Sequence, residues 1–294
     1  MIDLAKKLAE ITEQERKMQL HINSPLPSLD ELSELMVLLK RIIFPVFIDT
    51  SHNIESNRFY HIGVDLERVQ AILCNQIRRG FVFCCENKQC DLDNLSLDLT
   101  EKFMQQLPEI KRLLLTDVKA VAMRDPAVDN YGEVVFSYPI IQVMLHHRVA
   151  HELYKLGVPI IPRIISEQAH SRTGIDIHPA ATIGEYFAID HGTGVVIGAT
   201  TIIGNHVMLY QGVTLGAKNF QYDADGNPID TPRHPILEDN VTIYSNASVL
   251  GRITIGHDSI IGGNVWVTQD VPPHSRILQS RPIREYGFSD GEGI

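Results

Sequence analysis

The sequence has no long hydrophobic run and no excess of positive charge. No stretch of its 294 residues reaches the roughly 18 consecutive apolar residues that a membrane-spanning helix requires. The N-terminus also lacks the basic, apolar and small-residue order of a signal peptide, so we expect a soluble, cytoplasmic protein. The formal net charge of -10 at pH 7 argues against a nucleic-acid-binding protein, which would need a basic surface for the phosphates.

Cysteine is scarce and is confined to the first 90 residues. The chain has Cys74, Cys84, Cys85 and Cys90, whose spacing matches neither a Cys-x-x-Cys metal site nor a disulfide framework. We therefore predict buried or unreactive thiols, and we expect no metal in this protein.

The first part of the chain shows helical periodicity. Ser28 and Glu31 occupy capping-box positions, apolar residues then recur at intervals of three and four, and Pro45 ends the pattern. Similar amphipathic patterns cover residues 65–79, 98–121 and 138–156. These patterns predict an all-α domain over residues 1–172.

The hydrophobic pattern changes to a period of six after Thr173. Aliphatic residues head successive hexads at Ile177, Ile183, Ile189, Ile197, Ile203, Leu209, Leu215, Leu237, Ile243, Val249, Ile255, Ile261 and Val267. Small or β-branched residues hold the fifth position, with Phe187 as the bulky exception. This repeat is typical of a parallel β-helix, in which each short strand stacks on the next coil. We predict an α+β protein whose left-handed parallel β-helix spans residues 173–283, with a flexible tail over 284–294.

Two segments interrupt this repeat. A slip of two residues at Val195-Val196 follows the stretch DHGTG, residues 190–194, and residues 217–236 are too polar and too rich in turn residues to continue the strands. Binding groups tend to lie on loops that extend from a rigid solenoid. The two interruptions are therefore the candidate functional segments, and the second one ends in Arg233 and His234.

His191 in the first interruption is a candidate general base. A neutral imidazole with an ordinary pKa of about 6.5 suits proton abstraction at neutral pH, and a carboxylate on its other nitrogen would set its tautomer. Asp190 precedes His191, glycines follow it, and Asp176 lies at the entrance to the solenoid. The residues alone leave open a structural corner histidine with a satisfied hydrogen bond.

The run DIHPAATIGEYFAIDHGTGVVIGATTIIGNHVMLYQGVTLG, Asp176 to Gly216, closely resembles the serine O-acetyltransferases that begin cysteine biosynthesis. RDPAVDNY at 124–131 and RHPILEDNVTI at 233–243 resemble other active-site segments of the same family. The resemblance implies acetyl transfer from acetyl-CoA to the hydroxyl of L-serine, with feedback inhibition by cysteine.

The resemblance also implies catalytic roles for individual residues. His191 would remove the proton of the serine hydroxyl, Asp176 would orient His191, and His234 would help to stabilise charge at the reacting centre. Direct attack in a ternary complex needs no acetyl-enzyme, which agrees with the absence of cysteine from the predicted β-helix.

Binding roles follow from the same resemblance. Asp125 and Asp190 would hold the ammonium group of serine, while Arg233 and His234 would hold its carboxylate, for which the planar guanidinium is well suited. The positions that match the family's acetyl-CoA contacts are Gly216, Ala217, Ser245 and Gly263.

Two kinds of partner are implied by the resemblance. The chain ends in SDGEGI, which is similar to the family's tail peptide that enters the active site of O-acetylserine sulfhydrylase to form the cysteine synthase complex; Ile294 would be the contact residue. Hexapeptide acyltransferases form trimers with active sites between neighbouring subunits, so we expect a homotrimer or a hexamer formed as a dimer of trimers.

Three alternatives remain at this stage. The protein could be another hexapeptide acyltransferase that uses a sugar or antibiotic hydroxyl, or a noncatalytic regulatory partner of cysteine synthase. It could also be a zinc enzyme resembling the γ-class carbonic anhydrases, for which His191, His206 and His234 are nominal ligands.

Overall fold

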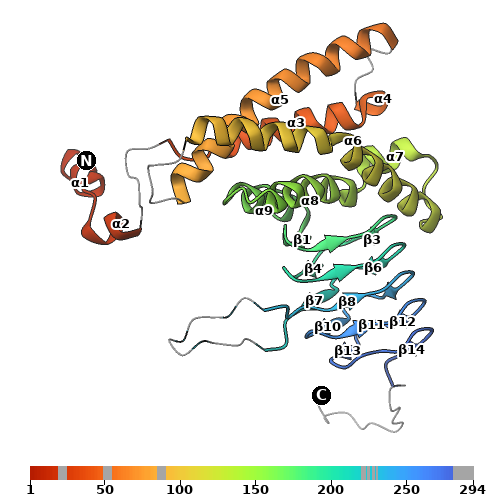
Figure 1. Ribbon diagram of the computed structural model, residues 1–294. Coiled ribbons are helices and arrows are strands. Elements are labelled where there is room, and N and C mark those ends of the chain that lie inside the picture. The colour runs from red at the N-terminus through yellow and green to blue at the C-terminus, as the bar shows by residue number, and fades with distance from the viewer. Residues whose placement is uncertain are drawn as a thin grey trace.

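A layer of helices lies across one end of a three-sided stack of short parallel strands (Figure 1). The computed structural model describes residues 1–18, 25–48, 55–84, 91–219, 223, 226, 229 and 231–280. Its helices are α1 (Ile2–Ala9), α2 (Glu13–Met18), α3 (Leu29–Ile43), α4 (Pro45–Ile48), α5 (Glu55–Cys84), α6 (Leu92–Arg124), α7 (Tyr131–Ser137), α8 (Pro139–Lys155) and α9 (Ile161–Thr173).

The strands that follow are two or three residues long. They are β1 (Asp176–Ile177), β2 (Thr182–Ile183), β3 (Ala188–Asp190), β4 (Val196–Ile197), β5 (Ile202–Ile203), β6 (Met208–Tyr210), β7 (Thr214–Gly216), β8 (Ile236–Leu237), β9 (Thr242–Ile243), β10 (Ser248–Leu250), β11 (Thr254–Ile255), β12 (Ile260–Ile261), β13 (Trp266–Val267) and β14 (Arg276–Ile277).

The start of α3 shows how local and tertiary interactions share a helix end. The Ser28 hydroxyl accepts a hydrogen bond from the Glu31 amide at 3.2 Å, as the capping-box pattern predicts. The Ser28 amide, however, donates to Gln76 Oε1 of α5 at 2.8 Å, and the Glu31 carboxylate accepts from the Gln76 side-chain amide. The contact with α5 therefore replaces the second bond of the capping box.

The long helices α5 and α6 extend well beyond the predicted patterns. They have 30 and 33 residues and pack on one another, while α8 packs on α6 and α9. Their shared core contains the fully buried side chains Leu35, Leu39, Leu73, Ile77, Phe103, Ile110 and Leu114. Within the described ranges, no helix combines the length and the apolar character needed to cross a membrane.

The solenoid confirms the predicted repeat and the predicted β-helix. Sheet 1 has the strand order β1-β4-β7-β10-β13, sheet 2 has β2-β5-β8-β11 and sheet 3 has β3-β6-β9-β12-β14, all parallel. The hexad heads of sheet 1 stack in register and are buried, namely Ile177, Ile197, Leu215, Val249 and Val267. Because each aliphatic side chain covers the one below it, a regular period of six becomes a continuous core.

Three corners connect the sheets, and each is named here after one histidine. The His191 corner joins sheet 3 to sheet 1 and contains residues 191–195, 211–213, 244–247 and 262–265. The His234 corner joins sheet 1 to sheet 2 and contains, among the described residues, 178–181, 198–201, 217–219, 231–235 and 251–253. The His257 corner joins sheet 2 to sheet 3 and contains residues 184–187, 204–207, 238–241, 256–259 and 272–275.

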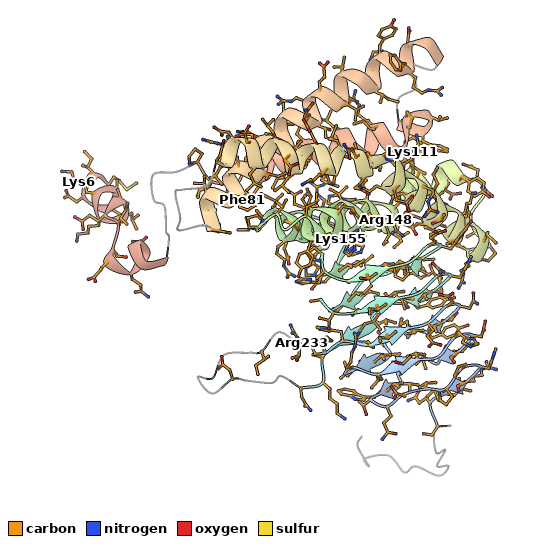
Figure 2. All side chains as sticks on the ribbon, in the orientation of Figure 1. Lys6, Phe81, Lys111, Arg148, Lys155 and Arg233 are labelled. Atoms are coloured by element: carbon orange, nitrogen blue, oxygen red, sulfur yellow. The ribbon has the colours of Figure 1, made fainter. Side chains whose placement is uncertain are left out.

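A buried ion pair joins the helices to the first coil of the solenoid. Arg148 of α8 donates to both carboxylate oxygens of Asp117 in α6 at 2.8 and 2.9 Å, and the two side chains are 4% and 0% exposed. Arg148 also donates to the Gly184 carbonyl at 2.9 Å, and the Phe187 amide donates to Asp117 at 3.3 Å. Figure 2 shows Arg148 where the helices meet the strands. Phe187 is fully buried there, which explains the bulky exception to the hexad pattern.

Histidines buried in α8 should make the fold sensitive to acid. Burial lowers the pKa of His146 to about 4, and it also lowers the pKa values of His147 and His151. Below pH 6.5 the unfolded chain therefore binds protons that the folded chain excludes, so stability should fall between about pH 6.5 and 4. The titration of His146 alone should lower the free energy of unfolding by about 2 kcal/mol between neutral pH and pH 5.

Urea unfolding at pH 7.5, 6 and 5 measures this loss directly. His146→Leu should reduce the change in free energy of unfolding between pH 7.5 and 5, whereas His61→Leu on α5 should leave that change intact. Equal stability of the unmodified chain at pH 7.5 and 5 would contradict the prediction.

Candidate active site

The predicted register slip is a widened turn at the His191 corner. Residues 191–195 connect β3 to β4, whereas only residues 211–213 connect β6 to β7 one coil further on. His191 begins the wide turn with a left-handed φ of 58°, and Gly192 follows at 88°. A Cβ on Gly192 would press against the side chain of Ile175, so this position requires glycine. The two extra residues therefore lift His191 out of the regular stack.

The His191 imidazole is accessible to solvent and to a substrate. Its side chain is 76% exposed, and its Nε2 lies 3.7 Å from Asp190 Oδ1 at the end of β3. No hydrogen bond or ion pair joins His191 to Asp176 in the described structure. Asp176 instead lies beside Glu167 and His170 of α9. The predicted pairing of Asp176 with His191 therefore stays a prediction.

Asp125 reaches the same corner from the helical layer. It is the C-cap of α6, and its carboxylate accepts hydrogen bonds from the Tyr138 hydroxyl at 2.6 Å and from the Ala127 amide at 2.8 Å. These two bonds and the nearby His191 lower the pKa of Asp125, which keeps it ionised. The hydrogen bond to Asp125 is the largest cause that raises the pKa of Tyr138 to about 12, and the charge of Asp190 is one of the smaller ones. Two carboxylates thus lie close to one exposed imidazole.

His234 lies at the His234 corner in a fixed orientation. The amide of Thr200 donates to its Nδ1 at 3.1 Å, and the Thr200 hydroxyl lies 2.9 Å from the same nitrogen. Burial, and after it the charges of Arg233, His178 and Arg252, together lower the pKa of His234 to about 4. Because Nδ1 accepts, the neutral ring carries its proton on Nε2. His234 can therefore donate one hydrogen bond to an anionic group.

Arg233 lines a cavity of about 260 Å³ beside His234. The same cavity is lined by Lys218 and Arg252, so three basic side chains surround it. Arg252 also donates to the carbonyls of Thr200 and His234 at 2.7 and 3.0 Å, which holds the corner together. Figure 2 shows Arg233 at the side of the solenoid. This arrangement suits a carboxylate or a phosphate.

The predicted site residues are thus divided between two corners, which lie at opposite ends of the strands of sheet 1. Ser245 and Gly263 share the His191 corner, where a Cβ on Gly263 would lie 3.1 Å from the Ser245 carbonyl. Gly216 and Ala217 lie at the His234 corner, at the end of β7. Within one chain, the three steps from Val195 through β4 to Gly198 separate the corners by roughly 10 Å, at about 3.3 Å for each step. One chain therefore does not bring its two halves of the site together.

The histidines of the predicted zinc alternative are also separated. His206 belongs to the His257 corner, where its ring stacks on Tyr186 at 4.5 Å between centroids. His191, His206 and His234 thus lie at three different corners of the solenoid. No single chain brings these three side chains to one metal.

Several functional contacts had no counterpart in the sequence pattern. The bond from Tyr138 to Asp125 depends on the packing of α8 beside α6, and the bond from Thr200 to His234 joins two neighbouring coils. Lys218 and Arg252 meet at the cavity because consecutive coils stack at the same corner. A repeat pattern predicts which side chains point inward, but it does not show which outward ones meet.

The chain resembles proteins of one family in sequence and in structure. The family described as Bacterial transferase hexapeptide (six repeats) matches residues 234–269. The plasmid serine acetyltransferase of Synechococcus elongatus is 46% identical over 278 residues, which cover 92% of this chain and 86% of that protein.

Solved structures of serine acetyltransferases share the fold. Isoform 3 from Entamoeba histolytica, in complex with cysteine, has a TM-score of 0.73 and 31% identity, covering 98% of this chain and 92% of its own. The Neisseria gonorrhoeae enzyme, in complex with serine, has a TM-score of 0.56 and 25% identity, covering 89% and 99%. The sequence match spans both the helical layer and the solenoid, and the chain belongs to the serine acetyltransferase family.

Proposed function

We propose that this protein transfers the acetyl group of acetyl-CoA to the hydroxyl of L-serine and releases O-acetylserine and CoA. The observation that carries the proposal is the grouping of Asp125 and Asp190 around the exposed His191. These three residues lie within the sequence motifs of the family. The arrangement favours an amino-acid acceptor over a sugar, because two carboxylates beside a base suit an ammonium group.

His191 serves as the general base in this proposal. The serine hydroxyl is a weak nucleophile at neutral pH, and an imidazole within reach removes its proton as the oxygen attacks the thioester carbonyl. The tetrahedral intermediate then collapses, the carbon–sulfur bond breaks, and the CoA thiolate takes up the proton. Asp176 is retained as the residue that orients His191, and its pairing requires a rearrangement of the corner relative to this structure.

Serine binding requires two copies of the chain. Its ammonium group would lie between Asp125 and Asp190, and its carboxylate would accept hydrogen bonds from Arg233 and from the Nε2–H of His234. In one chain these two pairs lie at opposite ends of the strands of sheet 1, which is too far apart for one small amino acid to contact both. We therefore propose a trimer, or a dimer of trimers, in which the His191 corner of one copy faces the His234 corner of the next.

Acetyl-CoA would lie along the same interface. Ser245 and Gly263 at one corner, and Gly216 and Ala217 at the other, have small or absent side chains and leave backbone groups open to the pantetheine amides. Lys218 and Arg252, which sequence patterns did not single out, add positive charge that suits the phosphates of CoA. Because the neutral His234 ring has only its Nε2–H to donate, His234 would act at the reacting centre by sharing this hydrogen bond with the serine carboxylate.

Regulation and partners follow from the family. The Entamoeba histolytica enzyme was crystallised with cysteine, which supports feedback inhibition by cysteine at the serine site of this protein. Docking of O-acetylserine sulfhydrylase to the tail and Ile294 stays a prediction, because these residues lie outside those that the structure describes. A cytoplasmic location likewise stays a prediction.

A thiol-release assay tests the proposed function. Purified protein with acetyl-CoA and L-serine should release free CoA, and sugars or homoserine in place of serine should give little release. Release with a sugar but not with serine would favour another hexapeptide acyltransferase. A folded protein that releases no thiol with any acceptor would instead support a noncatalytic partner of cysteine synthase.

Substitution of Gly198 should disable His234 specifically. A Cβ at Gly198 would overlap the imidazole ring of His234, so Gly198→Ala must displace that ring. We expect the KM for serine to rise at least tenfold, because the carboxylate loses a hydrogen bond worth about 1.5 kcal/mol or more. Gly63→Ala, on an open face of α5, serves as the matched control and should leave KM unchanged. An unaltered KM in Gly198→Ala would exclude His234 from serine binding.

A further inference from the structure

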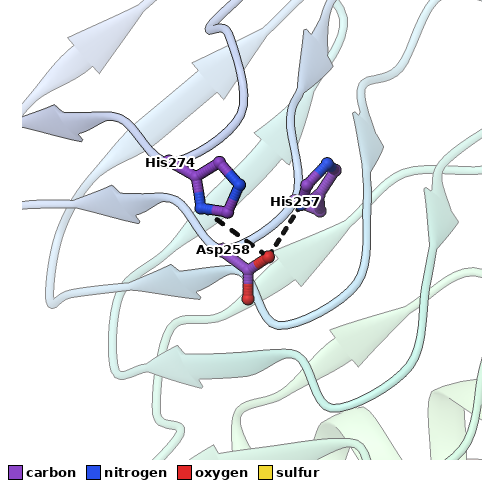
Figure 3. A group of neighbouring side chains, drawn as sticks. All are labelled: His257, Asp258 and His274. Atoms are coloured by element: carbon purple, nitrogen blue, oxygen red, sulfur yellow. Dashed lines mark hydrogen bonds and ion pairs between the residues drawn. The ribbon is translucent and has the colours of Figure 1, made fainter.

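A group of three polar side chains at the His257 corner lies outside the proposed acetyl-transfer site. His257 Nδ1 is 2.7 Å from Asp258 Oδ2, and His274 Nδ1 is 3.9 Å from the same oxygen. One nitrogen or oxygen of each residue lies within 4.8 Å of the others. Figure 3 shows both rings beside the Asp258 carboxylate, with their nitrogens directed at it. The sequence does not display this group, because His274 comes from the next coil.

The backbone holds these three residues in place. Asp258 and His274 occupy the left-handed corner position of successive coils, with φ of 57° and 58°, above Asn240 at 62°. The His274 amide donates to the His257 carbonyl at 2.9 Å, and the His257 amide donates to Glu238 at 2.8 Å. The side chains therefore extend from a rigid stack rather than from a flexible loop, which is the condition for a preorganised site.

The spacing of the three groups fits a small divalent cation. Tetrahedral Zn²⁺ with bonds of about 2.0 to 2.1 Å places its ligand atoms about 3.4 Å apart, and the distances of 2.7 and 3.9 Å fall on either side of this value. The His257 and His274 side chains are 46% and 70% exposed, so a water molecule can reach a fourth position. A donor set of two imidazoles and one carboxylate suits Zn²⁺ and its neighbours in the first transition row, rather than Mg²⁺ or Ca²⁺.

Asn240 supports the carboxylate from the coil below. Hydrogen bonds from His257 and from Asn240 reach the Asp258 carboxylate, which therefore has one partner in its own coil and one in the coil below. Such an outer partner orients a metal ligand.

The second group of possible metal ligands in the described part of the chain is less suitable. It consists of Glu167, His170 and Asp176, and it has a single imidazole. Arg163 forms an ion pair with Glu167 at 2.5 Å and occupies that carboxylate. Asp176 belongs to the proposed acetyl-transfer site. The His257 corner is therefore the better candidate.

We propose that His257, Asp258 and His274 bind one Zn²⁺ ion at the surface and thereby connect the last two coils of the solenoid. This departs from the absence of metal expected from the sequence. The site takes no part in acetyl transfer, because it lies at a corner different from those of His191 and of His234. The proposal therefore does not depend on the proposed function.

Zinc titration of the full, untagged chain tests the site. Metal-free protein titrated with ZnCl₂ in a calorimeter should bind one equivalent of Zn²⁺, and MgCl₂ should give no binding. Asp258→Asn and His274→Asn should each weaken the affinity at least tenfold. Asparagine is chosen because it tolerates the left-handed backbone of both positions, so the corner keeps its fold. Zn²⁺ should also raise the melting temperature of the unmodified chain but not that of His274→Asn.

A matched variant separates this site from the other group. His170→Asn removes the histidine beside Asp176 and should bind Zn²⁺ as the unmodified chain does. Three results would overturn the proposal: no zinc binding at micromolar concentrations, equal affinity in Asp258→Asn and His274→Asn, or loss of binding in His170→Asn instead.

Discussion

Replacement of His191 by asparagine is expected to lower kcat by about 10²- to 10⁴-fold, the usual contribution of a general base. The substitution removes the proton acceptor from an exposed position where the side chain has no packing role, since it is 76% exposed. Asparagine is a cleaner choice than alanine because it tolerates the φ of 58° at this corner. His191→Ala should show the same loss in kcat together with a modest loss in stability.

His206→Asn is the matched control for this prediction. His206 also has a left-handed φ, of 57°, but it lies at a different corner and stacks on Tyr186. Its kcat should stay within about twofold of the unmodified protein, by the low effect expected away from the site. Thiol release measures both variants, and circular dichroism with acetyl-CoA binding shows that the fold and the cosubstrate site persist. Unchanged kcat in His191→Asn would remove His191 from the role of base.

Replacement of Asp117 by alanine is expected to lower the free energy of unfolding by about 3 to 5 kcal/mol. The variant leaves the Arg148 guanidinium buried at 4% exposure with no carboxylate to balance its charge. It also removes the acceptor of the Phe187 amide, which lies just before β3 in the first coil. Because the pair joins α6 and α8 to the solenoid, the loss should weaken the junction between the two layers.

Glu185→Gln provides the comparison at the same junction. Glu185 in the first coil forms an ion pair with Arg112 of α6 at 2.8 Å, but these side chains are 38% and 48% exposed. Water and salt screen such a pair, so its loss should cost less than about 1 kcal/mol. Urea unfolding at pH 7.5 compares the two variants. Equal losses in Asp117→Ala and Glu185→Gln would show that the buried pair has no special role.

The period of six was sufficient to predict the β-helix. An aliphatic side chain at every sixth position must be buried, and parallel stacking of short strands is the way to bury all of them at once. The first residues of the hexads lie in strands, as the sequence pattern predicted, and Ile177, Ile197 and Leu215 of sheet 1 are examples. The widened turn near Val196 could also be predicted from the sequence, because a regular stack has no room for two extra residues. The hydrogen bonds at helix ends were harder to predict, since the Ser28 amide donates to Gln76, 48 positions away, and not to Glu31.

The sequence alone determined the coils of this protein and the motifs that identify its family, because both depend on residues close together in the chain. Only the tertiary structure decided which outward side chains meet. It brought Asp125 to the His191 corner through the packing of α6 on the first coil, and it placed His234 at the other end of the strands of sheet 1. It also stacked His274 beside Asp258. Those meetings depend on how coils and helices pack, which a repeating hydrophobic pattern does not specify.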